Sequence, residues 1–179
     1  MLIQRTAAGD KQGFGQLYDR FSGAMYGTAV QILGDTAEAQ DVVHDIFVML
    51  WEQAGRFDPQ RGSAFAWAIT LVRNRAIDRV RRRRRRNELL SNAAPDDLGY
   101  TDRHAMSGDL SAERSEEARR VRAAVAELPL EQKTALELAF FRGLTQEEIA
   151  RALPAPLGTV KARIRRGLLK LRDSLARRS

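Results

Sequence analysis

The sequence predicts an all-α protein made of two small helical domains joined by a flexible acidic linker. Three observations lead to this fold class. Apolar residues recur three or four positions apart over long stretches, which places them on one face of an α-helix. The alternation of apolar and polar residues that marks a β-strand appears nowhere in the 179 residues. Two basic stretches, 73–86 with net charge +8 and 161–179 with +7, flank an acidic one, 87–117, with −6.

The first predicted domain, residues 1–86, begins with a helix at about residues 11–33. Its buried face is predicted from apolar residues at helical spacing, namely Phe14, Leu17, Phe21, Met25, Ala29 and Ile32. Gly34 ends this helix, and Asp35 or Thr36 caps the next one. The buried stripe of that second helix is predicted to be Ala39, Val42, Val43, Ile46, Met49 and Leu50.

A loop at 57–62 precedes the third predicted helix. The core side of this helix is predicted to carry Phe65, Ile69, Val72, Ala76 and Val80. A basic stripe, rotated from that side by about 100°, consists of Arg75, Arg79, Arg82 and Arg86. The first domain is therefore predicted to be a compact helical unit with one basic edge.

Residues 87–111 lose the apolar period and gather Ser, Asn, Asp and Gly, so they are predicted to be a flexible acidic linker. The second predicted domain is 112–179. Helical spacing resumes near Val121 and breaks at Pro129. A helix at about 131–142 follows, with Ala135, Leu136, Ala139 and Phe140 at helical spacing.

The clearest motif is a helix-turn-helix after Gly143. Thr145 stands three residues before Glu148, the signature of a capping box that begins a helix. Pro154 and Pro156 break that helix, and another begins near Leu157 with the inward residues Val160, Ile164, Leu168, Leu171 and Leu175. Its outer face is left with Thr159, Lys161, Ala162, Arg163, Arg165 and Arg166, which suits a helix in the major groove of DNA.

Composition narrows the function classes. Only four of the 30 basic residues are Lys, and Arg has the planar fork that suits phosphates and base edges. The absence of Cys and the presence of only two His leave no thiol chemistry and no credible metal site. No carboxylate cluster for two metals and no phosphate-cradling glycine loop is visible. We therefore expect a cytoplasmic, cofactor-free nucleic-acid-binding protein that is not an enzyme and does not insert into the membrane.

Three motifs in order carry a resemblance to a known family. They are DVVHDIFVMLW (41–51), AWAITLVRNRAIDRVRR (66–82), and the pair GLTQEEIARAL (143–153) and PLGTVKARIRRGLLKLR (156–172). Over nearly its whole length the chain resembles the bacterial sigma-70 family of RNA polymerase sigma factors, extracytoplasmic-function (ECF) group. The resemblance implies that 1–86 is sigma region 2 and 112–179 is sigma region 4. It also implies binding to core RNA polymerase, promoter recognition, DNA melting and transcription initiation.

The same resemblance implies three sets of site residues. The helix at 41–51 would bind the beta-prime coiled coil of core polymerase through Asp41, His44, Asp45, Phe47 and Trp51. The loop 56–64 and the third helix would bind the −10 promoter element through Arg56, Arg61, Arg73, Asn74, Arg75, Arg79, Arg82 and Arg83. The −35 element would be bound by Thr159, Lys161, Arg163, Arg165 and Arg166.

Further expectations and alternatives remain. The resemblance implies the beta flap of core polymerase, promoter DNA and an anti-sigma factor as partners. Pro154 stands where the family usually has Gly, so the turn is expected to be reshaped. Phe65 and Trp67 fit either base stacking or the core. A stand-alone helix-turn-helix repressor or activator and a nucleic-acid enzyme are the competing function classes.

Overall fold

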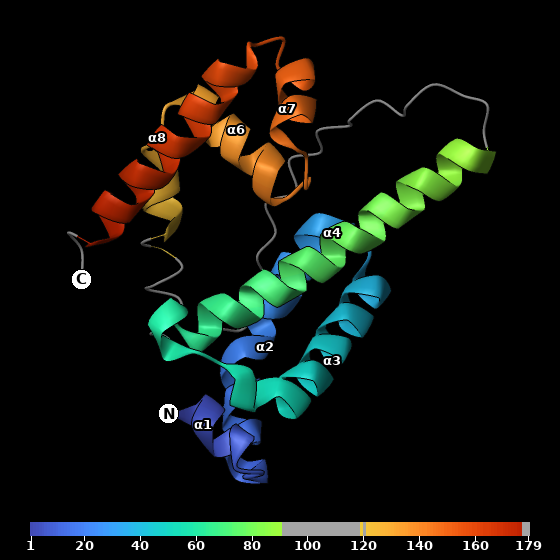
Figure 1. Cartoon of the computed structure of the whole chain (residues 1–179), viewed down its shortest axis with the longest axis vertical. Helices are drawn as coiled ribbons and strands as arrows, with labels where there is room; N and C mark the ends of the chain where they lie inside the picture. The colour runs from blue at the N-terminus through green and yellow to red at the C-terminus, as the bar shows by residue number, and fades with distance from the viewer. Residues whose placement is uncertain (91–118, 120, 177–179) are drawn as a thin grey trace. The chain divides into compact units, whose positions relative to one another are not determined.

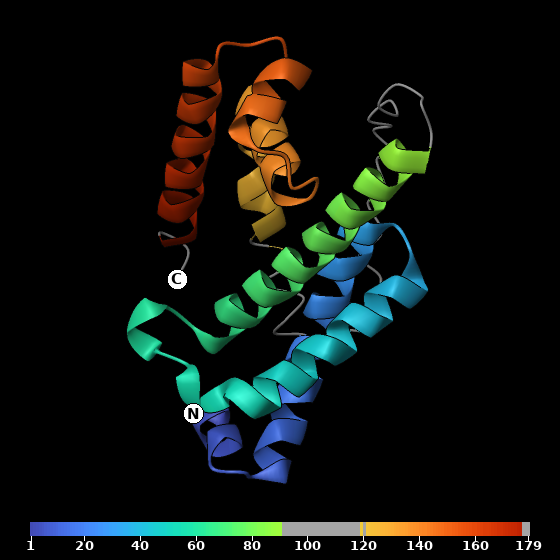
Figure 2. The same ribbon diagram turned by 45° about the vertical axis from the view of Figure 1, so that its right-hand side comes forward.

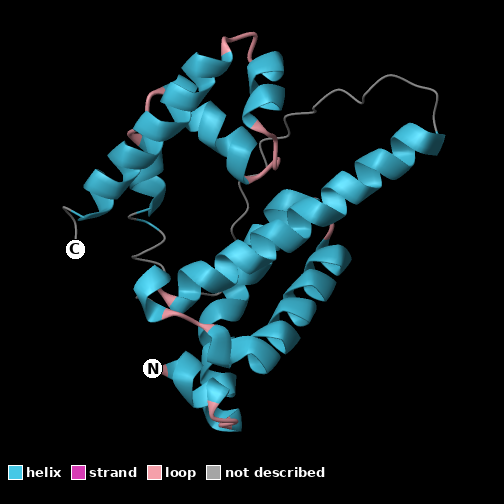
Figure 3. Ribbon diagram, in the orientation of Figure 1, coloured by secondary structure: helices cyan, strands magenta, loops and turns pink. Residues whose placement is uncertain are grey.

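The computed structural model describes residues 1–90, 119 and 121–176. These residues form helices joined by short turns, with no β-strand among them, so the predicted all-α fold class is confirmed (Figure 3). The chain divides into two compact units, Met1–Asp109 and Leu110–Ser179. Of the predicted linker, residues 91–111 lie outside the described part, and 87–90 belong to the last helix of the first unit. No helix in the described residues is long and apolar enough to span a membrane.

The first unit is built around the helix α2 (Lys11–Leu33). The helices α3 (Thr36–Gln53) and α4 (Ala64–Leu90) both pack on α2 and contact each other (Figures 1 and 2). Two 3-10 turns, η1 (Ala54–Arg56) and η2 (Pro59–Arg61), connect α3 to α4 where the sequence predicts a loop. α2 is therefore the common support of the two helices that carry the predicted polymerase and −10 residues.

The end of α2 at Gly34 and the start of α3 at Asp35 are as predicted, whereas the Asp10 cap of α2 was not predicted. Asp35 is the N-cap of α3, and its carboxylate accepts the Glu38 N–H at 2.9 Å. Gly34 ends α2 with a φ of +70°, a left-handed conformation that glycine adopts without a steric penalty. Asp10 caps α2 by accepting the Gly13 N–H at 3.0 Å.

The core of the first unit comes from the predicted stripes of α2 and α3. Leu17, Met25, Ile46 and Leu50 are all almost completely buried. Burying one such side chain contributes about 1.5–3 kcal/mol, so these residues contribute substantially to the unit's stability. Phe14 and Met49, at the edges of the two stripes, are half-buried.

The buried face of α4 matches the prediction at Val72 and Ala76 and differs from it in the first turns of the helix. Ala64, Ala68, Val72 and Ala76 are buried, whereas Phe65 is 39% exposed. The Phe65 ring packs only edge-on against Phe21, with centroids 5.2 Å apart. The prediction of Phe65 as a core residue is wrong, because alanines at four-residue intervals line the contact and bring α4 close to its neighbours.

The short helix α1 (Leu2–Ala7) was not predicted. It packs on α2 and η1, and Ile3 and Thr6 are buried there. A Cβ on Gly13 would lie 2.8 Å from the Arg5 Cβ, so glycine is what allows α1 to approach α2. Six residues are too few to display a helical period in the sequence.

The second unit contains α6 (Leu130–Phe140), α7 (Gln146–Ala152) and α8 (Leu157–Ala176), preceded by a helical segment at 121–126. α6 packs against α8, and α7 contacts both (Figure 2). Its buried cluster, formed by Leu144, Ile149 and Val160, is small and is extended by half-buried neighbours such as Ile164. The stability of this unit therefore depends on a small number of large buried side chains.

The prediction for the inward face of α8 also needs a correction, at Leu168. Gly167 faces α6, and a Cβ there would lie 2.7 Å from the Leu136 Cδ1. Leu168, predicted to point inward, is 54% exposed. The missing side chain at Gly167 lets the two helices approach, and this turns Leu168 toward solvent. Phe140 on α6 is likewise 38% exposed.

Candidate nucleic-acid interface

The predicted helix-turn-helix is present in the second unit as α7, a turn at 153–156, and α8. Both bonds of the capping box form: the Glu148 N–H donates to the Thr145 Oγ1 at 3.2 Å, and the Thr145 N–H donates to the Glu148 Oε2 at 2.7 Å. Two donors at the start of α7 are therefore satisfied by side chains. The capping box therefore sets the residue at which α7 begins.

The turn before α8 accommodates Pro154 without a left-handed residue. Among the described residues only glycines have a positive φ, and none of these lies in the turn. The Ala155 N–H donates to the Ala150 carbonyl at 3.1 Å, and the Val160 N–H donates to the Pro156 carbonyl at 3.1 Å. The turn thus uses backbone conformations that proline can adopt.

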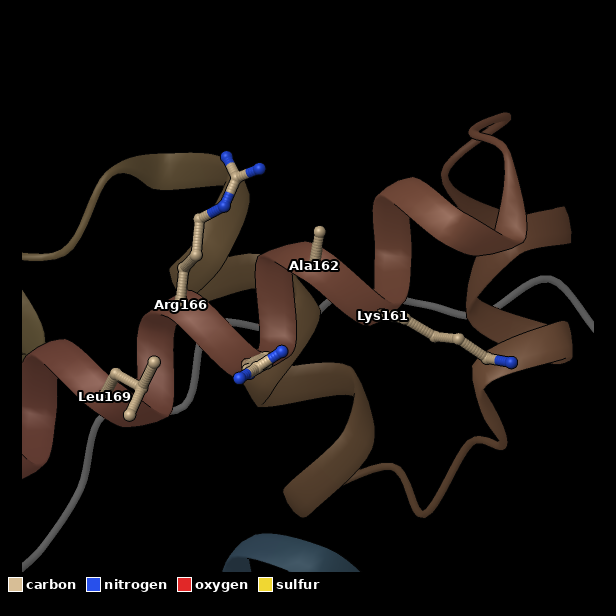
Figure 4. A pocket seen from close by; sticks show the side chains of 5 residues that line it. Lys161, Ala162, Arg166 and Leu169 are labelled. Carbon is tan, nitrogen blue, oxygen red and sulfur yellow. The ribbon is translucent and has the colours of Figure 1, made fainter.

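The outer face of α8 presents three cations to solvent. Lys161, Arg165 and Arg166 are exposed, as is Thr159 near the start of the helix. With Ala162 and Leu169 these cations line a hollow of about 490 Å³, and Figure 4 shows their side chains projecting from one helix. A hollow lined by a single helix is open, so a long anionic ligand such as a DNA backbone can follow it.

Arg163 differs from the other predicted −35 residues. Its Nη2 lies 3.0 Å from the Glu131 Oε2 on α6, and its side chain is only 23% exposed. Arg163 therefore links α8 to α6, while its neighbours on α8 point outward.

The connection between α3 and α4 carries two of the predicted −10 residues. Arg56 ends η1 and Arg61 ends η2, and both are exposed. Asp58 caps η2 by accepting the Gln60 N–H at 2.9 Å, and it lies 3.3 Å from the Arg61 Nε. The Phe57 and Trp67 rings lie 5.7 Å apart beside this connection, with both residues half-buried.

Four further −10 candidates lie along α4. Asn74 is exposed and accepts a hydrogen bond from the Arg73 Nη1 at 3.2 Å. Burial, and then the charge of Arg81, lowers the pKa of Arg73. Arg82 and Arg83 are exposed, and the Arg83 Nη2 lies 3.5 Å from the Leu33 carbonyl at the end of α2. These four residues, the ridge of α4, include one contacting pair, Arg73 with Asn74, and one contact with the end of α2, from Arg83.

Arg75 and Arg79 instead meet the acidic residues of α3. The Arg75 Nη2 lies 3.1 Å from the Asp45 Oδ2. The Arg79 guanidinium lies 3.7 Å from the Asp41 Oδ2 and 3.9 Å from the Asp45 Oδ2. Residues predicted for DNA are thus paired with residues predicted for the polymerase.

The residues predicted to bind the polymerase differ in how far they are exposed on α3. Asp41 and His44 are exposed and Trp51 is 36% exposed, but Phe47 is 3% exposed and packs against Phe14 and Tyr18. Phe47 therefore lies beneath the surface. Sequence reasoning missed Val48 and Tyr18, which are 45% and 48% exposed. For Val48 a signal existed, since it is an apolar residue outside the buried stripe and four positions after His44.

No group of three or more His, Cys, Asp or Glu that could hold a metal ion occurs among the residues described. The helix-turn-helix, its cationic outer face and the basic α4 define a class: a two-unit helical protein whose basic helices have the chemistry that suits nucleic acid.

Comparison with known proteins places the chain within this class. Residues 17–86 match the family model for sigma-70 region 2, and residues 118–171 match that for sigma-70 region 4. The ECF RNA polymerase sigma factor SigK of Mycobacterium tuberculosis (strain H37Rv) is 34% identical over 179 residues, covering 97% of this chain and 91% of that protein. SigK of Mycobacterium sp. (strain KMS) is 32% identical over 175 residues, covering 98% and 89%.

Among solved structures, Rhodobacter sphaeroides SigE in complex with the anti-sigma ChrR is 29% identical, with a TM-score of 0.49 and coverage of 96% and 94%. The sequence matches show that the chain belongs to the ECF group of sigma-70 family RNA polymerase sigma factors, as the motifs predicted. It is a transcription initiation factor.

Proposed function

We propose that this sigma factor binds core RNA polymerase through its first unit and directs it to promoters with a −10 and a −35 element. The observation that carries the proposal is the outward cationic face of α8 in a helix-turn-helix: Lys161 and Arg165 lie one turn apart and are both exposed. Such a helix reads base edges in the major groove with its outer residues. Thr159 and Arg166 join them in contacting the −35 element, and Arg163 supports α8 through Glu131.

The −10 element is assigned to the α3–α4 connection and the exposed ridge of α4. Arg56, Arg61, Arg73, Asn74, Arg82 and Arg83 are the residues assigned there. Phosphate contacts from arginines position the strand without reading sequence. Opening a duplex without ATP requires new contacts to unpaired bases, and the Trp67 ring beside Phe57 offers a stacking surface.

Core polymerase is assigned to the exposed face of α3, formed by Asp41, His44, Asp45 and Trp51 and extended by Val48. The sequence of α3 contains four acidic residues and no Lys or Arg. An acidic face with an aromatic residue at one end suits the basic groups expected on the beta-prime coiled coil. The second unit is assigned to the beta flap.

The proposal extends to regulation and location. An anti-sigma factor holds the protein inactive, as the ECF resemblance implies, and the protein acts in the cytoplasm without catalysis of its own. Stable co-purification with a small protein that blocks core binding is the expected result. Full activity of the free protein in unstressed cells would contradict this part.

The decisive experiment is reconstitution of the full chain with core polymerase on a genomic library, followed by sequencing of transcript starts. Defined starts sharing two upstream elements are expected, and they must be absent with core polymerase alone. Tight footprints of the chain on duplex DNA that do not change when core polymerase is added would favour a stand-alone repressor or activator.

A further inference from the structure

We propose that Arg79, assisted by Arg75, is a positioning residue for the polymerase-binding face of α3 and does not contact DNA. This inference rests on the proposed function, because it concerns the assigned polymerase surface. It is carried by one juxtaposition: the Arg79 guanidinium lies against three acceptors on α3. These are the Glu38 carbonyl at 3.3 Å, the Asp41 carboxylate at 3.7 Å and the Asp45 carboxylate at 3.9 Å.

The two carboxylates need such a partner. Asp41 and Asp45 are one helical turn apart on a helix without Lys or Arg, so their like charges repel each other. The guanidinium of Arg79 bridges them, and Arg75 holds the Asp45 Oδ2 from the other side at 3.1 Å. The pair of carboxylates is thereby kept on one face in a fixed arrangement, although Asp41 remains 72% exposed.

Arg79 is poorly placed for DNA. Its side chain is 28% exposed, and a hydrogen bond to the Glu38 carbonyl ties it to the backbone of α3. To reach a phosphate it would have to abandon all three acceptors. Arg82 lies three residues further along α4 and is exposed. It can therefore contact DNA without giving up contacts to α3.

Stability is a weak explanation for the network. The carboxylates are well exposed, Asp41 at 72% and Asp45 at 41%, and ion pairs to exposed carboxylates contribute little to folding because solvent screens them. The contact of α4 with its neighbours is already made by buried Val72 and Ala76. We therefore assign the network of Arg75 and Arg79 the role of orienting the carboxylates of Asp41 and Asp45.

Two variants of the full chain separate geometry from charge. Arg79→Lys keeps the positive charge but lacks the planar fork that reaches three acceptors, and Arg79→Gln removes the charge. We expect both to weaken binding to purified core polymerase roughly five- to tenfold, with the melting temperature unchanged within about 2 °C. Wild-type affinity of Arg79→Lys, or tighter binding by Arg79→Gln, overturns the proposal, since either means that charge alone matters.

A second comparison tests whether Arg79 affects polymerase binding by acting on the carboxylates of Asp41 and Asp45. In the Asp41→Asn, Asp45→Asn background, Arg79→Lys must cause no further loss of core affinity; an additive loss overturns the inference. Holoenzyme formed with saturating Arg79→Lys must bind a −10 fork DNA within about twofold of wild type, while Arg82→Ala binds it at least about fivefold more weakly. If the double Asn variant alone binds core polymerase normally, the assignment of α3 itself fails, which is a result distinct from failure of the Arg79 role.

Discussion

The basic helices of the two units use their charge differently. On α4, Arg75 and Arg79 face inward to the carboxylates of α3, and Arg83 lies near the Leu33 carbonyl. On α8, Arg163 alone among the five predicted −35 residues is tied across to another helix, while Lys161 and Arg165 are exposed. Two stretches of similar net charge in the sequence thus serve different purposes. In the first unit arginine is partly a structural residue, and in the second it is mainly a surface one.

The hydrophobic core of the second unit is smaller than that of the first. The largest effect we expect is therefore the loss of stability when a buried residue of the second unit is truncated. Ile149→Ala truncates one of the three residues of the buried cluster formed by Leu144, Ile149 and Val160, and it should cost about 2–5 kcal/mol. A core this small supplies only about 3–5 kcal/mol, so the second unit should unfold. Trp51 and Trp67, the only two tryptophans, both lie in the first unit. Circular dichroism should therefore show lost helix at a temperature where tryptophan fluorescence is unchanged.

The matched control for this experiment is Leu17→Ala in the larger core. It should lower the transition seen by tryptophan fluorescence and leave the first unit folded at room temperature. An equal shift of the fluorescence transition by Ile149→Ala would show that the units do not unfold separately.

The next effect contrasts the exposed and paired cations of α8. Arg165→Ala should weaken binding of holoenzyme to −35 DNA by about tenfold, or about 1.4 kcal/mol. Arg163→Ala should change DNA affinity less than threefold and, because an ion pair to an exposed carboxylate contributes little, lower the stability of the second unit by no more than about 1 kcal/mol. Glu131→Gln is the control and should match Arg163→Ala in stability. Equal losses of DNA affinity at both arginines would remove the distinction.

A smaller effect concerns the start of α7. Thr145→Ala removes one bond of the capping box and should destabilise the second unit by about 1 kcal/mol. The exposed Thr159, which caps nothing, provides the control, since Thr159→Ala should alter stability by less than about 0.5 kcal/mol. Chemical denaturation followed by circular dichroism measures both. A larger loss at Thr159 would contradict the assignment of the cap.

The smallest effect is the pH dependence of a cap in the first unit. The Gly13 N–H, followed by Arg5, lowers the pKa of Asp10 below its ordinary value of 3.8. Ionised Asp10 therefore stabilises the fold above pH 3.8, and this contribution is lost as the pH falls through the lower folded pKa. Asp10→Asn keeps a capping side chain, so its melting temperature should approach that of wild type on acidification. A difference independent of pH would show that charge is not involved.

Much of the helix pattern could be predicted from the sequence because it depends on neighbouring residues. Asp35, Gly34 and Thr145 act as caps and stops through bonds within a few positions of themselves. The helix-turn-helix followed from the same local rules.

What could not be predicted depends on partners distant in sequence. Phe65 and Leu168 fit a helical period, but Ala64 and Ala68 of α4 and Gly167 of α8 lie at the contacts, so these two predicted inward residues are exposed while Val72, Ala76 and Val160 are buried as predicted. The pairing of Arg79 with Asp41 joins positions 38 residues apart, and periodicity within one helix carries no information about it. Phe47, predicted for the polymerase-binding surface, lies inside because its ring packs against Phe14 and Tyr18 of α2.

The two prolines between α7 and α8 have a consequence for the approach to a promoter. Pro154 and Pro156 hold φ near one value even in the unfolded chain, so little conformational freedom is lost when this connection becomes ordered. With fewer conformations open to the connection, the angle between α7 and α8 is partly set before any partner is met. On the proposed function, the recognition helix would then meet a promoter with little rearrangement of the turn.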